Sequence, residues 1–94
     1  MEKSLREVIY NRLFLRDMEK AKRSALCSEE ELFPVIAALR ADRPLAPRLR
    51  DHLLTGDWKH HRECHVRPNL LLIYRKEPGK LHLVRLGSHS EVFR

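Results

Sequence analysis

Several residue types are scarce in this chain of 94 residues, and each scarcity excludes a class of protein. Only two cysteines occur, Cys27 and Cys64, and their spacing forms no C-x-x-C pair. We therefore expect neither a disulfide framework nor a thiol redox motif, but two reduced, packed thiols. No apolar run approaches the roughly 20 residues that span a bilayer, and residues 1–4 do not open a signal peptide. The sequence thus predicts a soluble, cytoplasmic protein.

Charge, in contrast, is abundant and mostly positive. Nineteen Lys and Arg residues against thirteen Asp and Glu give a net charge of +6, and 43% of the residues are apolar. Such a chain can bury one modest core, so we expect residues 1–94 to form a single domain. A small basic domain attracts polyanions, because each phosphate contact releases condensed counterions. Nucleic acid is the partner that this charge favours, although many small soluble proteins are basic.

The first half of the chain has the patterns of one short strand and two helices. Residues 5–10 are rich in β-formers and predict an edge strand. Asn11 is a helix N-cap, and the helix after it shows an apolar stripe at three- and four-residue spacing, made of Leu13, Phe14, Met18, Ala21 and Ala25. We therefore expect the first helix to pack this stripe against a sheet.

Ser28 begins a second predicted helix, with a run of three glutamates after it that includes a capping-box partner. Pro34 lies close enough to the first turn to be tolerated. The stripe expected to be buried consists of Leu32, Val35, Ile36 and Leu39. Pro44 and Pro47 then end the helix and predict an extended connection.

The second half reads as three strands, at residues 58–67, 70–75 and 80–86, separated by short turn sequences. Short connections favour an antiparallel meander. Residues 70–73 are apolar at every position, which is typical of a central strand covered on both faces. The predicted fold class is α+β in the order β-α-α-β-β-β, with two N-terminal helices on one face of a small, mainly antiparallel sheet.

Histidine is unusually frequent, and zinc binding is the first explanation to test. The six histidines are His52, His60, His61, His65, His82 and His89. His61 and His65 have a spacing that holds zinc on a helix. On a strand the same spacing covers roughly 13 Å, too far for ligands that must lie ~2.0–2.3 Å from one ion. We therefore expect no metal site and no cofactor.

Acid–base cleavage of RNA makes a demand that these histidines meet. One imidazole removes the proton of the attacking 2′-hydroxyl and another protonates the leaving 5′-oxygen, while basic side chains stabilise the charge that develops. Strand alternation places Trp58, Cys64 and Val66 on the buried face, and His65 on the open face together with Lys59, His61, Glu63 and Arg67. The basic candidates for contacts to RNA are Arg48, Arg50, Lys59, Arg62, Arg75 and Arg85. For Arg62, an ion pair at the edge of the core stays an equal alternative.

Three segments then resemble a known family. Residues 51–59 (DHLLTGDWK), 62–74 (RECHVRPNLLLIY) and 87–93 (GSHSEVF) are similar in order and spacing to the YafQ branch of RelE/ParE-type toxins. The resemblance runs from about Pro44 to the C-terminus, and the first half agrees only in layout. It implies the RelE-like fold and a toxin of a type II toxin–antitoxin pair that cleaves mRNA on the ribosome by 2′-hydroxyl attack, without a metal ion.

The resemblance also implies an active site at His52, His65, His89 and Phe93. Asn69 stands at a further catalytic position that is commonly Asp, and Leu70 stands where the family has Trp. An amide can bind a hydroxyl or phosphate but cannot accept a proton as a carboxylate does, and we expect the loss of Trp to remove a surface on which a base stacks. The expected bystanders are His60, His61 and His82.

The roles that follow are a hypothesis. His65 and His89 share the duties of base and acid, His52 orients the phosphate or substitutes for one of them, and Phe93 stacks on a base. A cognate antitoxin is the expected protein partner, in a complex that represses its own operon. Two alternatives stay open: a ParE-like poison of DNA gyrase on the same fold, and an RNA- or ribosome-binding relative with impaired catalysis.

Overall fold

The computed structural model describes residues 4–93 and contains five strands and three α-helices. The elements are, in chain order, β1 (Glu7–Tyr10), α1 (Arg12–Arg23), α2 (Glu29–Arg40), β2 (His52–Leu53), β3 (Arg62–Arg67), β4 (Leu70–Glu77), β5 (Lys80–Gly87) and α3 (His89–Val92). Two single-turn 3₁₀ helices, η1 (Pro47–Leu49) and η2 (Gly56–Trp58), flank β2. The predicted α+β class is confirmed, with β2 and α3 as additions.

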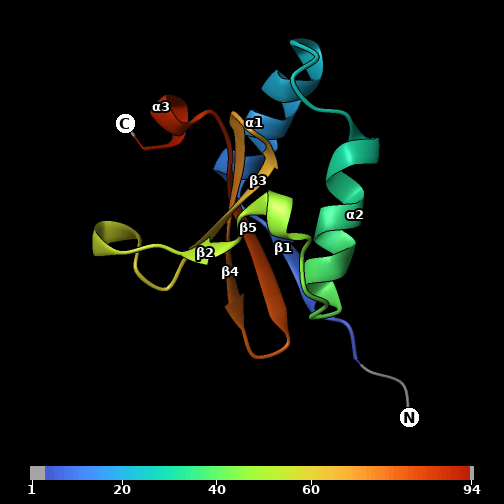
Figure 1. The fold of residues 1–94 in the computed structure, drawn as a ribbon. Coiled ribbons are helices and arrows are strands. Elements are labelled where there is room, and N and C mark those ends of the chain that lie inside the picture. The colour runs from blue at the N-terminus through green and yellow to red at the C-terminus, as the bar shows by residue number, and fades with distance from the viewer. Residues whose placement is uncertain (1–3, 94) are drawn as a thin grey trace.

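The strands form one mixed sheet in the order β1-β5-β4-β3-β2. β3, β4 and β5 form the expected antiparallel meander, and β1 joins the edge of β5 in parallel. α2 lies on one side of this sheet, whereas α3 and the loop that contains η2 lie on the other (Figure 1). The predicted layering, with one face covered by helices and the other partly open, is therefore confirmed.

The helices begin where their capping residues predict. The Asn11 side chain accepts a hydrogen bond from the Leu13 backbone N–H, and Ser28 forms a capping box with Glu31. All four residues of the predicted α2 stripe are buried. The α1 stripe is only partly right: Phe14 and Ala21 are buried, but Leu13 is 43% exposed and Ala25 lies past the helix end.

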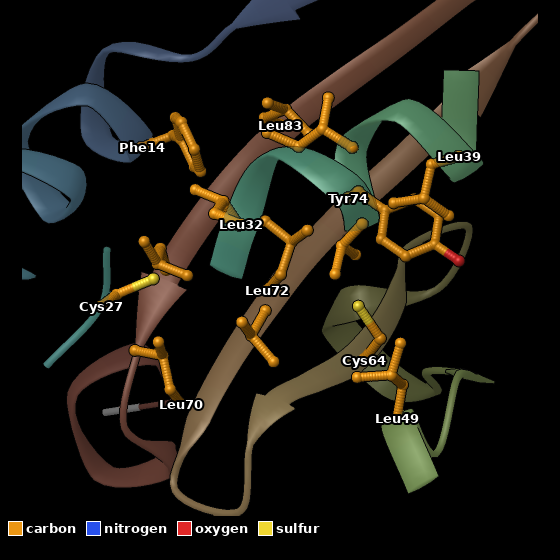
Figure 2. Packing of buried hydrophobic residues seen from close by; sticks show 14 of the residues in the cluster. Phe14, Cys27, Leu32, Leu39, Leu49, Cys64, Leu70, Leu72, Tyr74 and Leu83 are labelled. Carbon is orange, nitrogen blue, oxygen red and sulfur yellow. The ribbon is translucent and has the colours of Figure 1, made fainter. Parts of the chain in front are cut away.

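The core lies between the two long helices and one face of the sheet. Figure 2 shows Phe14 of α1 and Leu32 of α2 pointing into the same layer as Leu72 of β4. β4 is the middle strand, and its residues Leu70–Tyr74 are buried on both faces, as the unbroken apolar run predicts. Leu71 and Ile73 are buried outside the helix-side core, so alternation places them under the open face.

The C-terminal part of β5, beyond Leu83, lacks a neighbouring strand on its outer edge. β1 pairs only with β5 residues up to Leu83. Beyond that point the Asp17 carboxylate of α1 accepts a hydrogen bond from the Leu86 backbone N–H. The same carboxylate forms an ion pair with Arg85. A side chain thus replaces the missing strand.

The predicted strands at 5–10 and 70–75 differ by two residues from β1 and β4, and the largest error lies at the start of β3. Residues 58–61 were expected to begin the first strand of the meander, but β3 begins only at Arg62. η2 occupies Gly56–Trp58, and His60 adopts a left-handed conformation with φ of 73°. That conformation breaks an extended ladder, so Trp58 belongs to the loop beside the sheet.

Candidate active site

A carboxylate on the open face joins two histidines from neighbouring strands. His52 of β2 pairs in register with Glu63 of β3, and His65 follows two residues later on the same face. The Glu63 Oε2 atom lies 3.1 Å from His52 Nε2 and 3.5 Å from His65 Nε2. The side chain of Glu63 is only 8% exposed. A buried carboxylate requires partners of this kind, because its desolvation is otherwise costly.

Backbone carbonyls fix the other nitrogen of each ring. His52 Nδ1 lies 2.7 Å from the Arg50 carbonyl oxygen, and His65 Nδ1 lies 3.3 Å from the Pro68 carbonyl oxygen. A carbonyl only accepts, so each Nδ1 donates a proton. With Nδ1 held in this way, each ring directs its Nε2 toward the Glu63 carboxylate.

A second network holds the segment that carries His52. Tyr74 donates its hydroxyl hydrogen to Asp51 Oδ1 at 2.5 Å, and Arg62 donates to Asp51 Oδ2 at 3.2 Å. Burial raises the pKa of Tyr74 well above its usual range, so the phenol stays a donor. The structure thus shows the alternative expected for Arg62, an ion pair at the edge of the core, here with Asp51.

The remaining aromatic side chains of the site form a cluster around α3. The rings of His89 and Phe93 lie 4.9 Å apart between centroids. Phe93 meets Trp58 of η2 edge-on at 5.7 Å, and Trp58 meets His61 at 5.2 Å. The loop after β2 and the C-terminal helix therefore meet over the open face. His61, an expected bystander, lies in this cluster.

α3 has only four residues and depends on local hydrogen bonds. Ser88 and Glu91 form a capping box, and Glu91 also accepts a hydrogen bond from Lys20 of α1 at 2.7 Å. The Lys20 ammonium and the bonds from Ser88 lower the pKa of Glu91 to about 2. The helix that presents His89 and Phe93 is thus tied to α1 by one ion pair.

Asn69 and Leu70 lie at the turn between β3 and β4. Asn69 is exposed at this turn, directly after the Pro68 carbonyl that holds His65. Leu70 is 3% exposed and packs in the helix-side core. Leu70 itself therefore presents no surface on which a base could stack, and the expectation that the loss of Trp removes such a surface stays a prediction.

The six basic candidates divide into two groups. Arg62, Arg75 and Arg85 each have a carboxylate within ion-pair distance, from Asp51, Glu77 and Asp17 respectively. Among residues 4–93, no carboxylate lies within 4 Å of the charged groups of Arg48, Arg50 or Lys59, and all three are exposed. Only the second group has positive charge free for phosphates.

Other titratable groups lie away from this site or are inert. His82 binds Glu77 near the far end of β5, and His60 is exposed on the loop. Both cysteines are free and buried, as expected, and burial raises the pKa of Cys64 to about 12. Within the described part of the chain, no group of three or more His, Cys, Asp or Glu side chains is suited to hold a metal ion.

Sequence reasoning missed two members of the site, Glu63 and Trp58. Alternation correctly placed Glu63 on the face of His65, and that shared face was the available signal. Its burial follows from the pairing of β2 with β3, which the sequence pattern did not predict.

The structure also contains, over residues 4–93, no helix long and apolar enough to cross a membrane.

Two curated toxins are similar to this chain over nearly its whole length. A putative toxin YafQ from Haemophilus influenzae is 36% identical over 96 residues, which cover 96% of this chain and 93% of the relative. The mRNA interferase toxin YafQ of Escherichia coli is 27% identical over 88 residues, 94% of this chain and 96% of its own.

Solved structures show the same fold over the same length. A copper-bound mutant toxin from Helicobacter pylori superposes with a TM-score of 0.91 at 38% identity, covering 95% of this chain and all of the toxin. The YafQ chain of the E. coli DinJ-YafQ toxin-antitoxin complex gives 0.86 at 28% identity, covering 96% and 99%. The family model described as the bacterial toxin of type II toxin-antitoxin system, YafQ, matches residues 6–94. This chain belongs to the YafQ family of type II toxins.

Proposed function

We propose that this protein is an mRNA interferase that cuts mRNA on the ribosome by 2′-hydroxyl attack, without a metal ion. The observation that carries the proposal is the pair of imidazoles held against the buried carboxylate of Glu63 on the open face of the sheet. The E. coli relative is named an mRNA interferase toxin, and this arrangement supplies proton donors and acceptors for that reaction.

The reaction needs two proton transfers around one phosphate. A base removes the proton from a ribose 2′-hydroxyl, whose oxygen forms a bond to the adjacent phosphorus. The bond from phosphorus to the 5′-oxygen of the next nucleotide breaks, and an acid protonates that oxygen. The products are a 2′,3′-cyclic phosphate and a free 5′-hydroxyl, so no electron acceptor or other reactant is required.

The residues divide these tasks according to their positions. His65 and His89 act as the base and the acid, one from the sheet and one from α3. His52 orients the phosphate, and Glu63 keeps His52 and His65 in place. Phe93 stacks on a base, and Asn69 donates hydrogen bonds to the RNA. Lys59, like Arg48 and Arg50, contributes positive charge that no carboxylate of the described residues balances.

The proposed partners are mRNA on the ribosome and a cognate antitoxin. The relative in the E. coli complex is bound to DinJ, and a basic toxin with +6 charge suits an acidic partner. We extend this to a complex that binds its own operator DNA. A substrate on the ribosome places the protein in the cytoplasm.

The decisive experiment treats the pure protein with EDTA, removes the chelator, adds the protein to translating ribosomes and maps the RNA ends. We expect cuts that leave cyclic phosphates, lost in His65→Ala and kept in His60→Asn, which changes an exposed histidine and tolerates its left-handed backbone. Cleavage that EDTA abolishes would overturn the metal-free mechanism. Intact RNA together with stalled gyrase would instead indicate a ParE-like toxin.

A further inference from the structure

A basic hollow lies beside the candidate active site, between η1 and the turn that joins β3 to β4. It measures about 270 Å³, and its lining is Arg48, Arg50, His65, Val66, Arg67 and Pro68. Val66 is buried, whereas the guanidinium groups lie on exposed residues. The hollow therefore has an apolar wall and a positively charged rim.

The three arginines of the hollow differ in how their charge is balanced. Arg67 donates two hydrogen bonds to Glu31, at 2.6 and 2.5 Å. Arg48 and Arg50 have no carboxylate within 4 Å among residues 4–93. Two arginines without a carboxylate partner among the described residues thus line one small space.

Two residues connect the hollow to the group formed by His52, Glu63 and His65. His65 lines the hollow and also faces Glu63. Arg50 lines it and also supplies the carbonyl that accepts from His52 Nδ1. The backbone of Arg50 is left-handed, with φ of 50°. A non-glycine residue in this region is strained, and such strain concentrates at functional sites because the surroundings must hold it.

A larger hollow elsewhere shows the contrast. It measures about 430 Å³ and lies between α1, β5 and α3. There Arg85 is paired with Asp17 and Lys20 with Glu91. Carboxylates that line the same hollow pair with these two positive groups. The space beside His65 is therefore the better site for an anion.

We propose that the basic hollow binds the phosphate group next to the scissile one in the substrate RNA. Arg48 and Arg50 bind this phosphate through their planar guanidinium groups, which match its oxygens in a bidentate way. The contact fixes the register of the strand, so that the scissile phosphate lies between His65 and α3. This proposal rests on the proposed RNA cleavage and adds a substrate-positioning subsite to it.

Binding to an uncleavable RNA tests the subsite separately from catalysis. The probe is a 2′-O-methyl oligonucleotide with a fluorescent end, whose blocked hydroxyls cannot attack. Anisotropy titrations over a salt series compare the parent with Arg48→Gln, Arg50→Asn and Arg16→Ala. Asn tolerates the left-handed backbone at position 50. Arg16 is the matched control, an exposed arginine of α1 with no ion pair among residues 4–93.

We expect Arg48→Gln and Arg50→Asn to weaken binding about tenfold each and to reduce the salt slope by about 0.7, the value for one lost contact on a single strand. Arg16→Ala should change affinity less than about twofold. Equal losses in all three variants would overturn the subsite, because they would show a general charge effect. Unchanged affinity in the first two would overturn it as well.

A neutral linkage placed along the probe sharpens the test. One methylphosphonate, moved from position to position, should weaken binding to the parent at the scissile phosphate and at its neighbour. In the Arg48→Gln/Arg50→Asn double variant the penalty at the neighbour should disappear. A penalty that persists there contradicts the subsite, even when the parent cleaves RNA normally. A parent that neither binds nor cleaves RNA overturns both proposals.

Discussion

The two halves of the candidate site are held in different ways. His52, Glu63 and His65 belong to paired strands, and their carboxylate is buried between the rings. His89 and Phe93 belong to a four-residue helix whose link to α1 is the ion pair between Lys20 and Glu91. Ladder hydrogen bonds fix the first half, whereas the second is held by a capping box, the buried side chain of Val92, the contact between Phe93 and Trp58 and a partly exposed salt bridge. The strand half is therefore pre-organised, and the helix half is the more easily displaced.

Removing the histidine of the helix half should have the largest effect. His89→Ala deletes one of the two proton-transfer groups, so the rate of cleavage on ribosomes should fall about 10²- to 10⁴-fold. His89 is exposed, so the melting temperature should stay within about 1 °C of the parent. Single-turnover cleavage and thermal melts measure the two quantities. A variant as fast as the parent would remove His89 from the mechanism.

The strand half is broken most specifically at Glu63. Glu63→Gln keeps the size of the side chain but removes the charge that faces His52 and His65, so kcat should fall about 10²-fold with a smaller change in KM. Glu19→Gln, an exposed glutamate of α1, is the control. If Glu63→Gln changed only the melting temperature, the carboxylate would serve the fold and not the reaction.

Removing the hydrogen bond that supports the segment of His52 should have an intermediate effect. Tyr74→Phe removes the hydroxyl that donates to Asp51, and we expect about 1 kcal/mol lower unfolding free energy and a severalfold lower kcat. Denaturant unfolding and cleavage assays measure these changes, with the half-exposed Tyr10→Phe as control. Adding Asp51→Asn should cost little more, because the two residues share one interaction. Fully additive losses would mean that they act independently.

The anchor of α3 should give the smallest effect, visible through pH. The pKa of Glu91 is about 2 when folded, against an ordinary 4.5. A lowered pKa contributes stability that is complete above pH 4.5 and is lost as pH falls toward 2. Glu91→Gln should therefore be less stable at pH 7 by under about 1 kcal/mol, and the two proteins should converge at pH 2. A difference that is constant from pH 7 to pH 2 would contradict the ion pair.

Local patterns predicted much of the fold. Asn11 and Ser28 begin the helices they were expected to cap, and the apolar run of β4 became the middle strand. Long-range pairings were harder to predict, since β2 has only two residues and its register with β3 is what buries Glu63. The ion pair between Arg85 and Asp17 joins residues 68 apart, so no local pattern indicates it. The positions of His52, His65, His89 and Phe93 came from the family resemblance, and their roles stay predictions.

The Asp17 carboxylate at the outer edge of β5 also bears on how molecules of this protein meet one another. An uncovered strand edge is a template on which another chain can add a strand, and this is a common route to aggregation. Asp17 occupies the Leu86 N–H at one edge of the sheet, and the opposite edge strand, β2, is two residues long. β1, the edge strand on the side of β5, has four residues, so both edge strands are short. Replacing Asp17 with alanine would free the Leu86 N–H, and we expect that variant to self-associate at lower concentration than the parent.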